Sequence, residues 1–210
     1  TFTIGDLNEI AATTAAHGIK SYLTVNTIIY DEDLVLMRQT VDAAHEAGIS
    51  AIIASDVAVM SYCNAIGQEV HLSTQLNISN AEALRFYARF ADVVVLAREL
   101  NLNQVRAIYE TIQREQIRGP KGELVRIEMF CHGALCMAVS GKCYLSLHEL
   151  NGSANRGACM QVCRRGFDVV RRGGAAAEMI PDDDPTYILK DKESDIELEV
   201  DNKYVMSPKD

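Results

Sequence analysis

The sequence predicts an α/β fold with a parallel sheet, of the kind found in a (β/α)₈ barrel of the TIM type. Short apolar runs rich in β-branched residues alternate five times with segments whose apolar residues recur at helical spacing. The interiors AIIA and VVVLA are apolar throughout, as expected of strands covered on both faces. Candidate strands lie at 20–26, 51–55, 69–75, 93–98 and 126–130, and candidate helices at 4–17, 32–47, 57–66, 79–90 and 102–117. Repeated helix-then-strand units imply crossover connections and therefore parallel strands.

Five units are too few for a complete eight-stranded barrel, which typically takes about 250 residues. The chain has 210 residues, opens on a helical pattern, and ends at VMSPKD after a strand-like segment. We therefore expect an incomplete barrel fragment with elements missing at both ends. An open doubly wound sheet is the alternative.

The element boundaries carry recognisable end signals. Gly18 and Gly48 follow candidate helices at the position where a left-handed residue often ends a helix. Asp31, Asp56 and Ser79 precede candidate helices and are candidate N-caps.

After Phe130 the alternation stops, which suggests three regions. Residues 1–130 form the predicted barrel portion and residues 131–166 a cysteine-rich cluster segment. Residues 167–210 form a small β appendage, in which TYILK and IELEVD alternate in strand fashion around a polar turn. The PDDDP stretch at 181–185 is a predicted loop.

The charge distribution bears on possible partners. Residues 178–210 carry eleven acidic and four basic side chains, a net charge of −7 out of −9 for the chain. The total disfavours a polyanion partner, but a local basic cluster remains at Arg164, Arg165, Arg171 and Arg172. No apolar run is long enough to span a bilayer, and no signal peptide is visible at the N-terminus. We expect a cytoplasmic protein without membrane association.

Four cysteines between Cys136 and Cys163 form the strongest chemical signal. Cys136 and Cys143 are separated by six residues, Cys143 and Cys159 by fifteen, and Cys159 and Cys163 by three. Thiolates that recur in a chain without secretory features are more often metal or cluster ligands than disulfide partners. Four thiolates suit tetrahedral zinc or a 4Fe–4S cluster. Because zinc usually takes short paired spacings, the irregular pattern favours the cluster, with zinc as the alternative.

The other two cysteines are expected to be structural. Cys63 lies on an amphipathic helix pattern, where a thiol packs as a small apolar residue. Cys131 directly follows the last candidate strand and could point inward.

Polar residues gather where the candidate strands end. In a parallel barrel the carboxyl ends of the strands form the functional face, so these residues predict a site for a small polar ligand. They are Asn26, Thr27, Ser55, Asp56, Ser73, Thr74, Gln75, Asn77, Arg98, Glu99, Glu128 and His132. Arg98 with the amides of Gln75 and Asn77 would hold a carboxylate ligand by charge-assisted hydrogen bonds. For each residue alone a structural role, such as helix capping by Asp56, competes with this interpretation.

Two residues are the candidate catalytic groups, Glu128 and His132, because they lie at the carboxyl end of the last candidate strand and directly after it. His71 lies inside a strand and, by alternation with Ser73 and Gln75, is expected to face the barrel lumen. The sequence contains no nucleophile elbow, metalloprotease helix motif or P-loop. Adjacent residues do not generally aim their side chains at each other, so Cys131 and His132 are a poor protease dyad.

Several stretches resemble the collagenase-like proteases, family 32 of the unassigned (U) peptidases. The run EMFCHGALCMAVSGKCYLS, from Glu128 to Ser146, is similar to the family signature, and NRGACMQVCR, from Asn155 to Arg164, resembles its next block. Further matches are VNT at 25–27, SD at 55–56, HLSTQLN at 71–77, ARE at 97–99 and the terminal MSPKD. The resemblance covers nearly the whole chain.

The resemblance implies an oxygen-independent hydroxylase that carries a 4Fe–4S cluster. Similar proteins modify a tRNA wobble uridine or an rRNA cytidine with prephenate as co-substrate, and others act in anaerobic ubiquinone synthesis. By this resemblance Cys136 and Cys143 are the firmest cluster ligands and Cys159 is the next. Either Cys163 or a residue beyond Asp210 supplies the fourth ligand. The matched block adds Asn155 and Arg156 to the substrate-binding residues.

Three function classes therefore remain open. The first is an RNA hydroxylase, in which Arg156, Arg164 and Arg165 would contact RNA phosphates. The second is the peptidase that the family label implies. The third is a zinc-stapled binding module without catalytic activity.

Overall fold

The computed structural model describes residues 3–133, 136–171, 187–192 and 197–200. The chain divides into two compact units. The first comprises residues 1–143 with 155–157, and the second comprises residues 144–154 with 158–210. Each unit is described below by itself.

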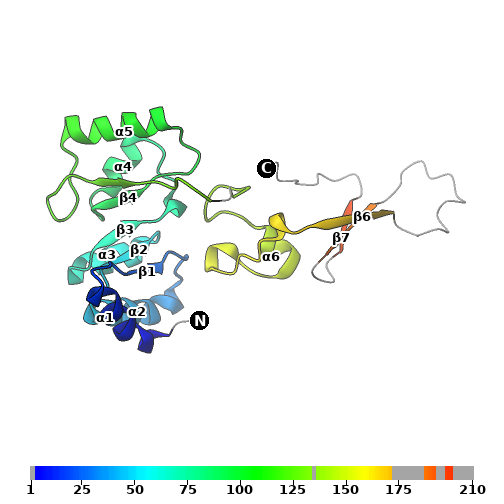
Figure 1. Ribbon diagram of the computed structural model, residues 1–210, viewed down its shortest axis with the longest axis horizontal. Coiled ribbons are helices and arrows are strands. Elements are labelled where there is room, and N and C mark those ends of the chain that lie inside the picture. Colours follow the sequence, from blue (N-terminus) through cyan, green and yellow to red (C-terminus); the bar gives the residue numbers. More distant parts are fainter. Residues whose placement is uncertain (1–2, 134–135, 172–186, 193–196, 201–210) are drawn as a thin grey trace, which may run out of the picture. The chain divides into compact units, whose positions relative to one another are not determined.

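A five-stranded parallel sheet organises the first unit, in the order β1-β2-β3-β4-β5 (Figure 1). Its strands are β1 (Tyr22–Val25), β2 (Ala51–Ala54), β3 (Val70–Leu72), β4 (Val93–Val95) and β5 (Arg126–Glu128). This confirms the predicted parallel α/β fold. Consecutive strands are neighbours throughout, whereas a doubly wound sheet reverses its order at a switch point. The order is that of a TIM-type barrel portion, and β1 and β5 form the two edges of the described sheet.

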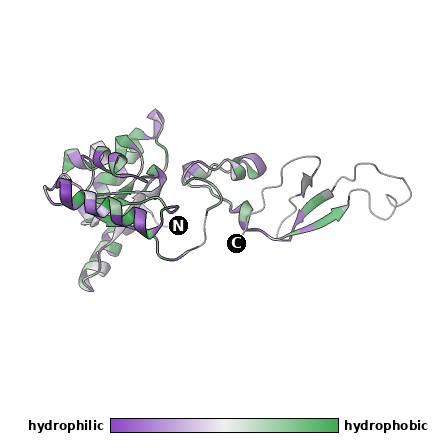
Figure 2. Cartoon of the chain, turned by 90° about the horizontal axis from the view of Figure 1, so that it is seen from above, coloured by the Kyte–Doolittle hydropathy of each residue, from purple (hydrophilic) through white to green (hydrophobic). Residues whose placement is uncertain are grey.

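Helices follow the predicted alternation. In the first unit they are η1 (Ile4–Asp6), α1 (Leu7–Ala16), η2 (Asp31–Asp33), α2 (Leu34–Ala47), α3 (Val57–Ile66), η3 (Thr74–Leu76), α4 (Ala81–Tyr87) and α5 (Leu102–Glu115). Hydrophobic and hydrophilic residues alternate along these helices (Figure 2), as amphipathic surface helices require.

The core lies between these helices and one face of the sheet. Val41 of α2, Met60 of α3 and Ile112 of α5 are fully buried there together with Ile52 and Leu72 of the sheet. Successive side chains of a strand point to opposite faces. The second face of the sheet therefore carries the alternate residues, namely Tyr22, Thr24, Ile53, His71, Val93, Val95, Arg126 and Glu128.

The predicted helix ends are confirmed at three positions. Gly18 and Gly48 adopt left-handed conformations, with φ of 65° and 81°. The Asp56 carboxylate accepts a hydrogen bond of 2.8 Å from the Ala58 N–H at the start of α3.

Two predicted caps are wrong. Asp31 lies inside the turn η2, and it is Asp33 whose carboxylate accepts the Tyr30 N–H at 2.9 Å. At α4 the cap is Asn80 rather than Ser79, because the Asn80 side chain accepts the Ala83 N–H at 2.8 Å.

The second unit contains a short helix, a 3₁₀ turn and an antiparallel sheet. These are α6 (Leu145–Leu150), η5 (Val162–Arg164) and the strands β6 (Phe167–Arg171), β7 (Tyr187–Asp191) and β8 (Glu197–Val200), in the order β6-β7-β8. This confirms the strand character of TYILK and IELEVD, whereas PDDDP lies outside the described residues. The further turn η4 (Ala154–Arg156) spans the boundary between the units. Among the described residues, no helix is long and apolar enough to cross a membrane.

Candidate functional site at the carboxyl end of the parallel sheet

Polar side chains that follow β1, β2 and β3 form one hydrogen-bond network. The Asn26 amide donates to the Ser73 hydroxyl at 3.3 Å. The Ser55 hydroxyl lies 2.7 Å from the Asn26 carbonyl and 3.1 Å from Gln75 Oε1. Because the carboxyl ends of parallel strands meet at one edge of the sheet, residues up to 47 positions apart come into contact here. The structure thus brings together four predicted site residues, Asn26, Ser55, Ser73 and Gln75.

The cysteine segment is attached to this end of the sheet through Ser140. The Asn77 amide donates to the Ser140 carbonyl at 3.0 Å, and Arg98 Nη2 donates to the buried Ser140 hydroxyl. Gly141 has a φ of 74° and lies so close to Gln75 that a Cβ would sit 3.1 Å from Gln75 Cβ. We call Asn77, Arg98 and Ser140 the Ser140 clamp. It holds the stretch between Cys136 and Cys143 against the sheet.

Two buried polar atoms of this clamp have no hydrogen-bond partner among the residues that the structure describes. They are Asn77 Oδ1, an acceptor, and Arg98 Nε, a donor. Buried polar atoms are rarely left unsatisfied, and each such atom costs about 1–3 kcal/mol. A ligand with both an acceptor and a donor would satisfy them.

His71 lies on the second face of the sheet between two carboxylates. Its Nε2 is 3.2 Å from Glu69 Oε1, its Nδ1 is 3.8 Å from Glu128 Oε2, and its ring is 4.8 Å from that of Tyr22, centre to centre. The imidazole is almost completely buried, whereas the Glu128 side chain is 53% exposed. His71 therefore lies between the partly buried carboxylate of Glu69, whose side chain is 16% exposed, and the more exposed carboxylate of Glu128.

Glu69 was not among the predicted site residues. Its carboxylate contacts His71, Arg126 at 3.0 Å and Lys121. Burial raises the pKa of Glu69, but hydrogen bonds and charge from Lys121 and His71 outweigh it and leave the pKa below its usual value. The signal that could have found it is strand alternation, since Glu69 precedes His71 by two residues.

Three further predicted residues of the first unit are either bound by backbone groups or exposed to solvent. Asp56 is occupied by backbone groups, because it accepts the Ile29 N–H at 3.1 Å in addition to capping α3. Glu99 and His132 are exposed. For these three residues the predicted substrate or catalytic roles stay predictions.

Asn155 and Arg156 contact the connection between β1 and α2. The Asn155 carbonyl accepts the Ile28 N–H at 3.1 Å. Arg156 donates to the Ile28 carbonyl at 2.7 Å and to the Asp33 carboxylate, and its guanidinium lies 4.7 Å from the centre of the Tyr30 ring. Hydrogen bonding from Arg156 lowers the pKa of Asp33. These contacts give Arg156 a structural role, and its predicted substrate contact stays a prediction.

All six cysteines are free thiols. Cys63 is buried in the core as predicted, and burial raises the pKa of its thiol to about 12. Cys131 is exposed, so the expectation that it points inward is wrong.

The four predicted ligands are divided between the two units. Cys136 and Cys143 belong to the first unit, and Cys159 and Cys163 belong to the second. Each is exposed or partly exposed, and none is in a disulfide, so the four side chains have the chemistry of thiolate ligands. Among the described residues, no three His, Cys, Asp or Glu side chains are grouped closely enough to hold a metal ion.

Fold and site together define an α/β protein whose cysteine segment is attached to the polar end of a parallel sheet. Comparison with known proteins gives the family. The family model described as "Peptidase family U32" matches residues 1–210, and the chain belongs to this family.

Curated relatives carry two kinds of name. The chain is 66% identical over 209 residues to a protein named "Collagenase" from Porphyromonas gingivalis, a match that covers 100% of this chain and 46% of the relative. It is 32% identical to "tRNA hydroxylation protein P1" of Bacillus subtilis, over 91% of this chain and 44% of the relative. It is 35% identical to "23S rRNA 5-hydroxycytidine C2501 synthase" of Escherichia coli, over 77% of this chain and 23% of the relative.

The chain thus spans less than half the length of these three relatives. No solved structure matches it.

Proposed function

We propose that the chain is the parallel-sheet portion of an iron–sulfur-dependent, oxygen-independent RNA hydroxylase. Relatives named for tRNA and rRNA hydroxylation support an RNA substrate, and with it we propose a cytoplasmic location. The observation that carries the proposal is the Ser140 clamp. It joins a segment with two candidate cluster ligands to the polar end of the sheet.

Cys136, Cys143, Cys159 and Cys163 would hold the 4Fe–4S cluster, with zinc as the alternative metal. When bound, such a cluster supplies electron transfer, with a potential set by its ligands, hydrogen bonds and solvent exposure. Cys63 is unsuitable as a ligand. It is buried in the core, and its raised pKa disfavours the thiolate that a ligand requires.

A small carboxylate such as prephenate would bind at the Ser140 clamp. Arg98 Nε would donate to the carboxylate, and Asn77 Oδ1 would accept a hydrogen bond from a ligand hydroxyl group. Both atoms are buried and unpaired in the structure. A guanidinium offers several N–H groups in one plane, so Arg98 can bind Ser140 through Nη2 and still donate from Nε.

The proposed RNA contacts involve the arginines of the cysteine segment. Arg156 and Arg165 already pair with Asp33 and Asp191, the second pair at 2.8 Å. Arg164 is exposed and donates to Gln161 Oε1 at 3.5 Å, and it would contact RNA phosphate together with these two arginines.

The cofactor is tested by anaerobic purification, iron and sulfide analysis, and an absorption spectrum. We expect about four irons per chain and a broad shoulder in the visible range that bleaches on reduction. Cys136→Ser and Cys143→Ser should each lose this chromophore. Cys131→Ser is the matched control, because Cys131 is an exposed thiol in the same region and is not a predicted ligand. Zinc without iron would support the non-catalytic binding module, and equal colour in all three variants would contradict the ligand assignment.

The RNA substrate is tested by nucleoside mass spectrometry. The protein would be expressed in cells that lack RNA hydroxylation, and total tRNA and rRNA would be digested and analysed. A hydroxylated pyrimidine that is present with the wild type and Cys131→Ser but missing with Cys136→Ser is the expected result. Intact cluster content without any hydroxylated nucleoside would count against RNA as the substrate.

A peptidase is the second candidate, and the relative named collagenase favours it. The structure offers little support for an activated nucleophile. His17, His45 and His71 contact a backbone carbonyl, an amide oxygen and a carboxylate, and none of these three contacts is to a hydroxyl or thiol of a described residue. Hydrolysis of denatured collagen by metal-free protein would support this candidate against the hydroxylase.

A further inference from the structure

The His71 imidazole lies between two carboxylates, those of Glu69 and Glu128, which differ in solvent exposure. In the sheet His71 is paired with Ile53 and Val93, and Val95 is paired with Glu128 on the next strand. Because alternate residues share a face, His71 and Glu128 lie on the second face together. The described groups nearest the ring there are Tyr22 from β1, the apolar Ile53 and Val93 from β2 and β4, Glu69 before β3, and Arg126 and Glu128 from β5.

The protonation of one ring nitrogen follows from Glu69. Lys121 and Arg126 both contact the Glu69 carboxylate, which lies 3.2 Å from His71 Nε2. An ionised carboxylate accepts hydrogen bonds and cannot donate them, so Nε2 carries a proton. The assignment of the tautomer thus comes from the hydrogen-bond network.

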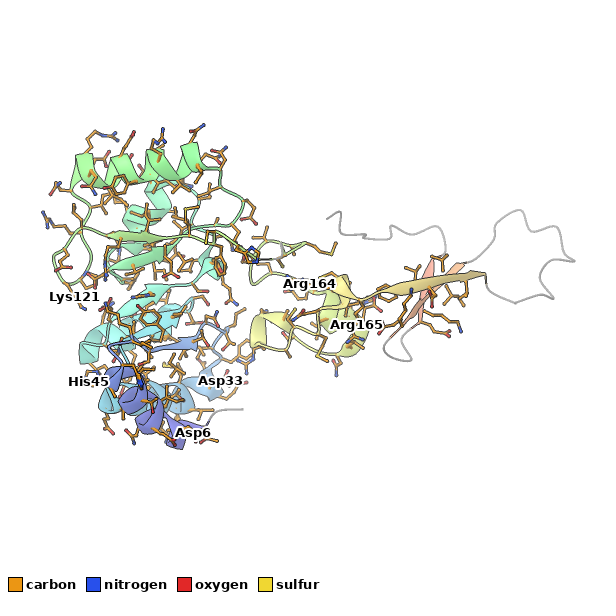
Figure 3. The ribbon with its side chains drawn as sticks, viewed as in Figure 1. Asp6, Asp33, His45, Lys121, Arg164 and Arg165 are labelled. Atoms are coloured by element: carbon orange, nitrogen blue, oxygen red, sulfur yellow. The ribbon has the colours of Figure 1, made fainter. Side chains whose placement is uncertain are left out.

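Lys121, one of the two cations that contact Glu69, has its backbone held by a hydrogen bond. Lys121, labelled in Figure 3, lies in the connection between α5 and β5, and its backbone N–H donates to the buried Asp92 carboxylate at 3.0 Å. Gly119 permits this approach, because a Cβ there would lie 2.8 Å from the Asp92 backbone. The orientation of His71 therefore depends on a packed support rather than on one flexible side chain.

The second ring nitrogen of His71, Nδ1, has a lone pair without a hydrogen-bond partner among the described residues. Nδ1 is buried without a hydrogen bond, and the nearest carboxylate oxygen is Glu128 Oε2 at 3.8 Å. A single proton placed between these two atoms would satisfy Nδ1, whether it is held by the imidazole or by the carboxyl group. Either form requires only a small movement of Glu128, whose side chain is half exposed.

We propose that Glu128, as a carboxylate, and His71, protonated only on Nε2, form the acid–base pair of this protein. Glu128 is the group that touches the substrate and takes a proton from its O–H or N–H. The proton then passes to His71 Nδ1, which gives an imidazolium between two carboxylates, while the substrate keeps the electron pair. His71 is a positioning residue that sets the protonation state of Glu128. The assignment goes beyond the proposed hydroxylase, because it requires neither RNA nor a cluster.

The test is nitrogen-15 NMR of the histidine side chains in the full chain without metal, at neutral pH. We expect His71 to carry its proton on Nε2. We also expect Glu128→Gln to change the nitrogen chemical shift of His71 Nδ1, because it replaces the carboxylate oxygen that lies 3.8 Å from this atom with an amide group.

Glu123→Gln is the matched control, because Glu123 is also exposed and lies in the connection before β5. It should leave the nitrogen chemical shifts of His71 unchanged. A proton on Nδ1 at neutral pH, or equal His71 nitrogen shifts in wild type and Glu128→Gln, would overturn the proposal. The tautomer in the wild-type protein tests it even where a variant folds poorly. Because neither measurement uses iron or RNA, its failure is distinguishable from failure of the hydroxylase.

Discussion

Cys63 shows how the environment of a single residue separates a packing thiol from a candidate ligand. Its side chain is fully buried in the core, and burial raises its pKa from 9.0 to about 12. The native thiol keeps its proton at a pH where an unfolded thiol has ionised. The stability that arises from this difference in pKa between the native and the unfolded thiol is therefore complete below about pH 9. It is lost as the pH rises from 9 toward 12.

We predict that Cys63 resists alkylation while the folded protein is exposed to iodoacetamide. At about pH 8, near the pKa of a free thiol, the exposed Cys131, Cys136 and Cys159 should react, because the thiolate is the nucleophile. Peptide mass spectrometry after brief labelling gives the measurement. Labelling in denaturant is the control and should modify all six cysteines. Equal labelling of Cys63 and Cys131 in the native protein would contradict the burial of Cys63.

At the scale of elements, the apolar periodicity predicted the helices and strands better than it predicted where each of them ends. All five helix–strand units were found from apolar spacing, because the core takes its residues from one stripe of each helix. Predicted strands were too long at their carboxyl ends, where Ser73 to Gln75 leave the strand and form a turn. Ser79 and Asn80 are both good cap residues, so the sequence could not choose between them.

The cap of α4 gives a matched pair of substitutions. Asn80→Ala should lower the free energy of unfolding by about 1 kcal/mol, because it removes the acceptor for the Ala83 N–H. Ser79→Ala should change it by less than about 0.5 kcal/mol, as is usual for an exposed residue without such a role. Urea denaturation measures both values. A larger loss for Ser79→Ala than for Asn80→Ala would show that the helix begins one residue earlier.

For the whole molecule, several residues of the polar cluster could be predicted from the sequence, but their contacts could not. Asn26, Gln75 and Asn77 were predicted because parallel strands bring their carboxyl ends together. The Ser140 clamp could not be predicted, since Asn77 and Ser140 are 63 positions apart and the cysteine segment has no periodicity. Glu69 was missed because a charged residue at the start of a strand resembles an exposed one until its partners Lys121 and Arg126 are known.

The Ser140 clamp makes the sheet and the cysteine segment energetically dependent on each other. Arg98 and Asn77 hold Ser140, which lies between Cys136 and Cys143. If these two thiolates bind a metal, the clamp restricts the loop that presents them and so favours the bound state. Residues that orient the ligands of a metal typically change its affinity about 10- to 100-fold when they are mutated.

Arg98→Met should therefore weaken retention of iron by about 10- to 100-fold, because it removes the donor to Ser140 while keeping most of the side-chain volume. The measurement is loss of the visible chromophore during titration with an iron chelator under anaerobic conditions. Arg106→Met on the exposed surface of α5 is the control and should release iron like the wild type. Equal release by the two variants would mean that the clamp does not support the ligands. Loss of the far-ultraviolet circular dichroism of Arg98→Met would instead indicate that Arg98 is needed for folding, and Ser140→Ala, which removes only the acceptor hydroxyl, would then decide the question.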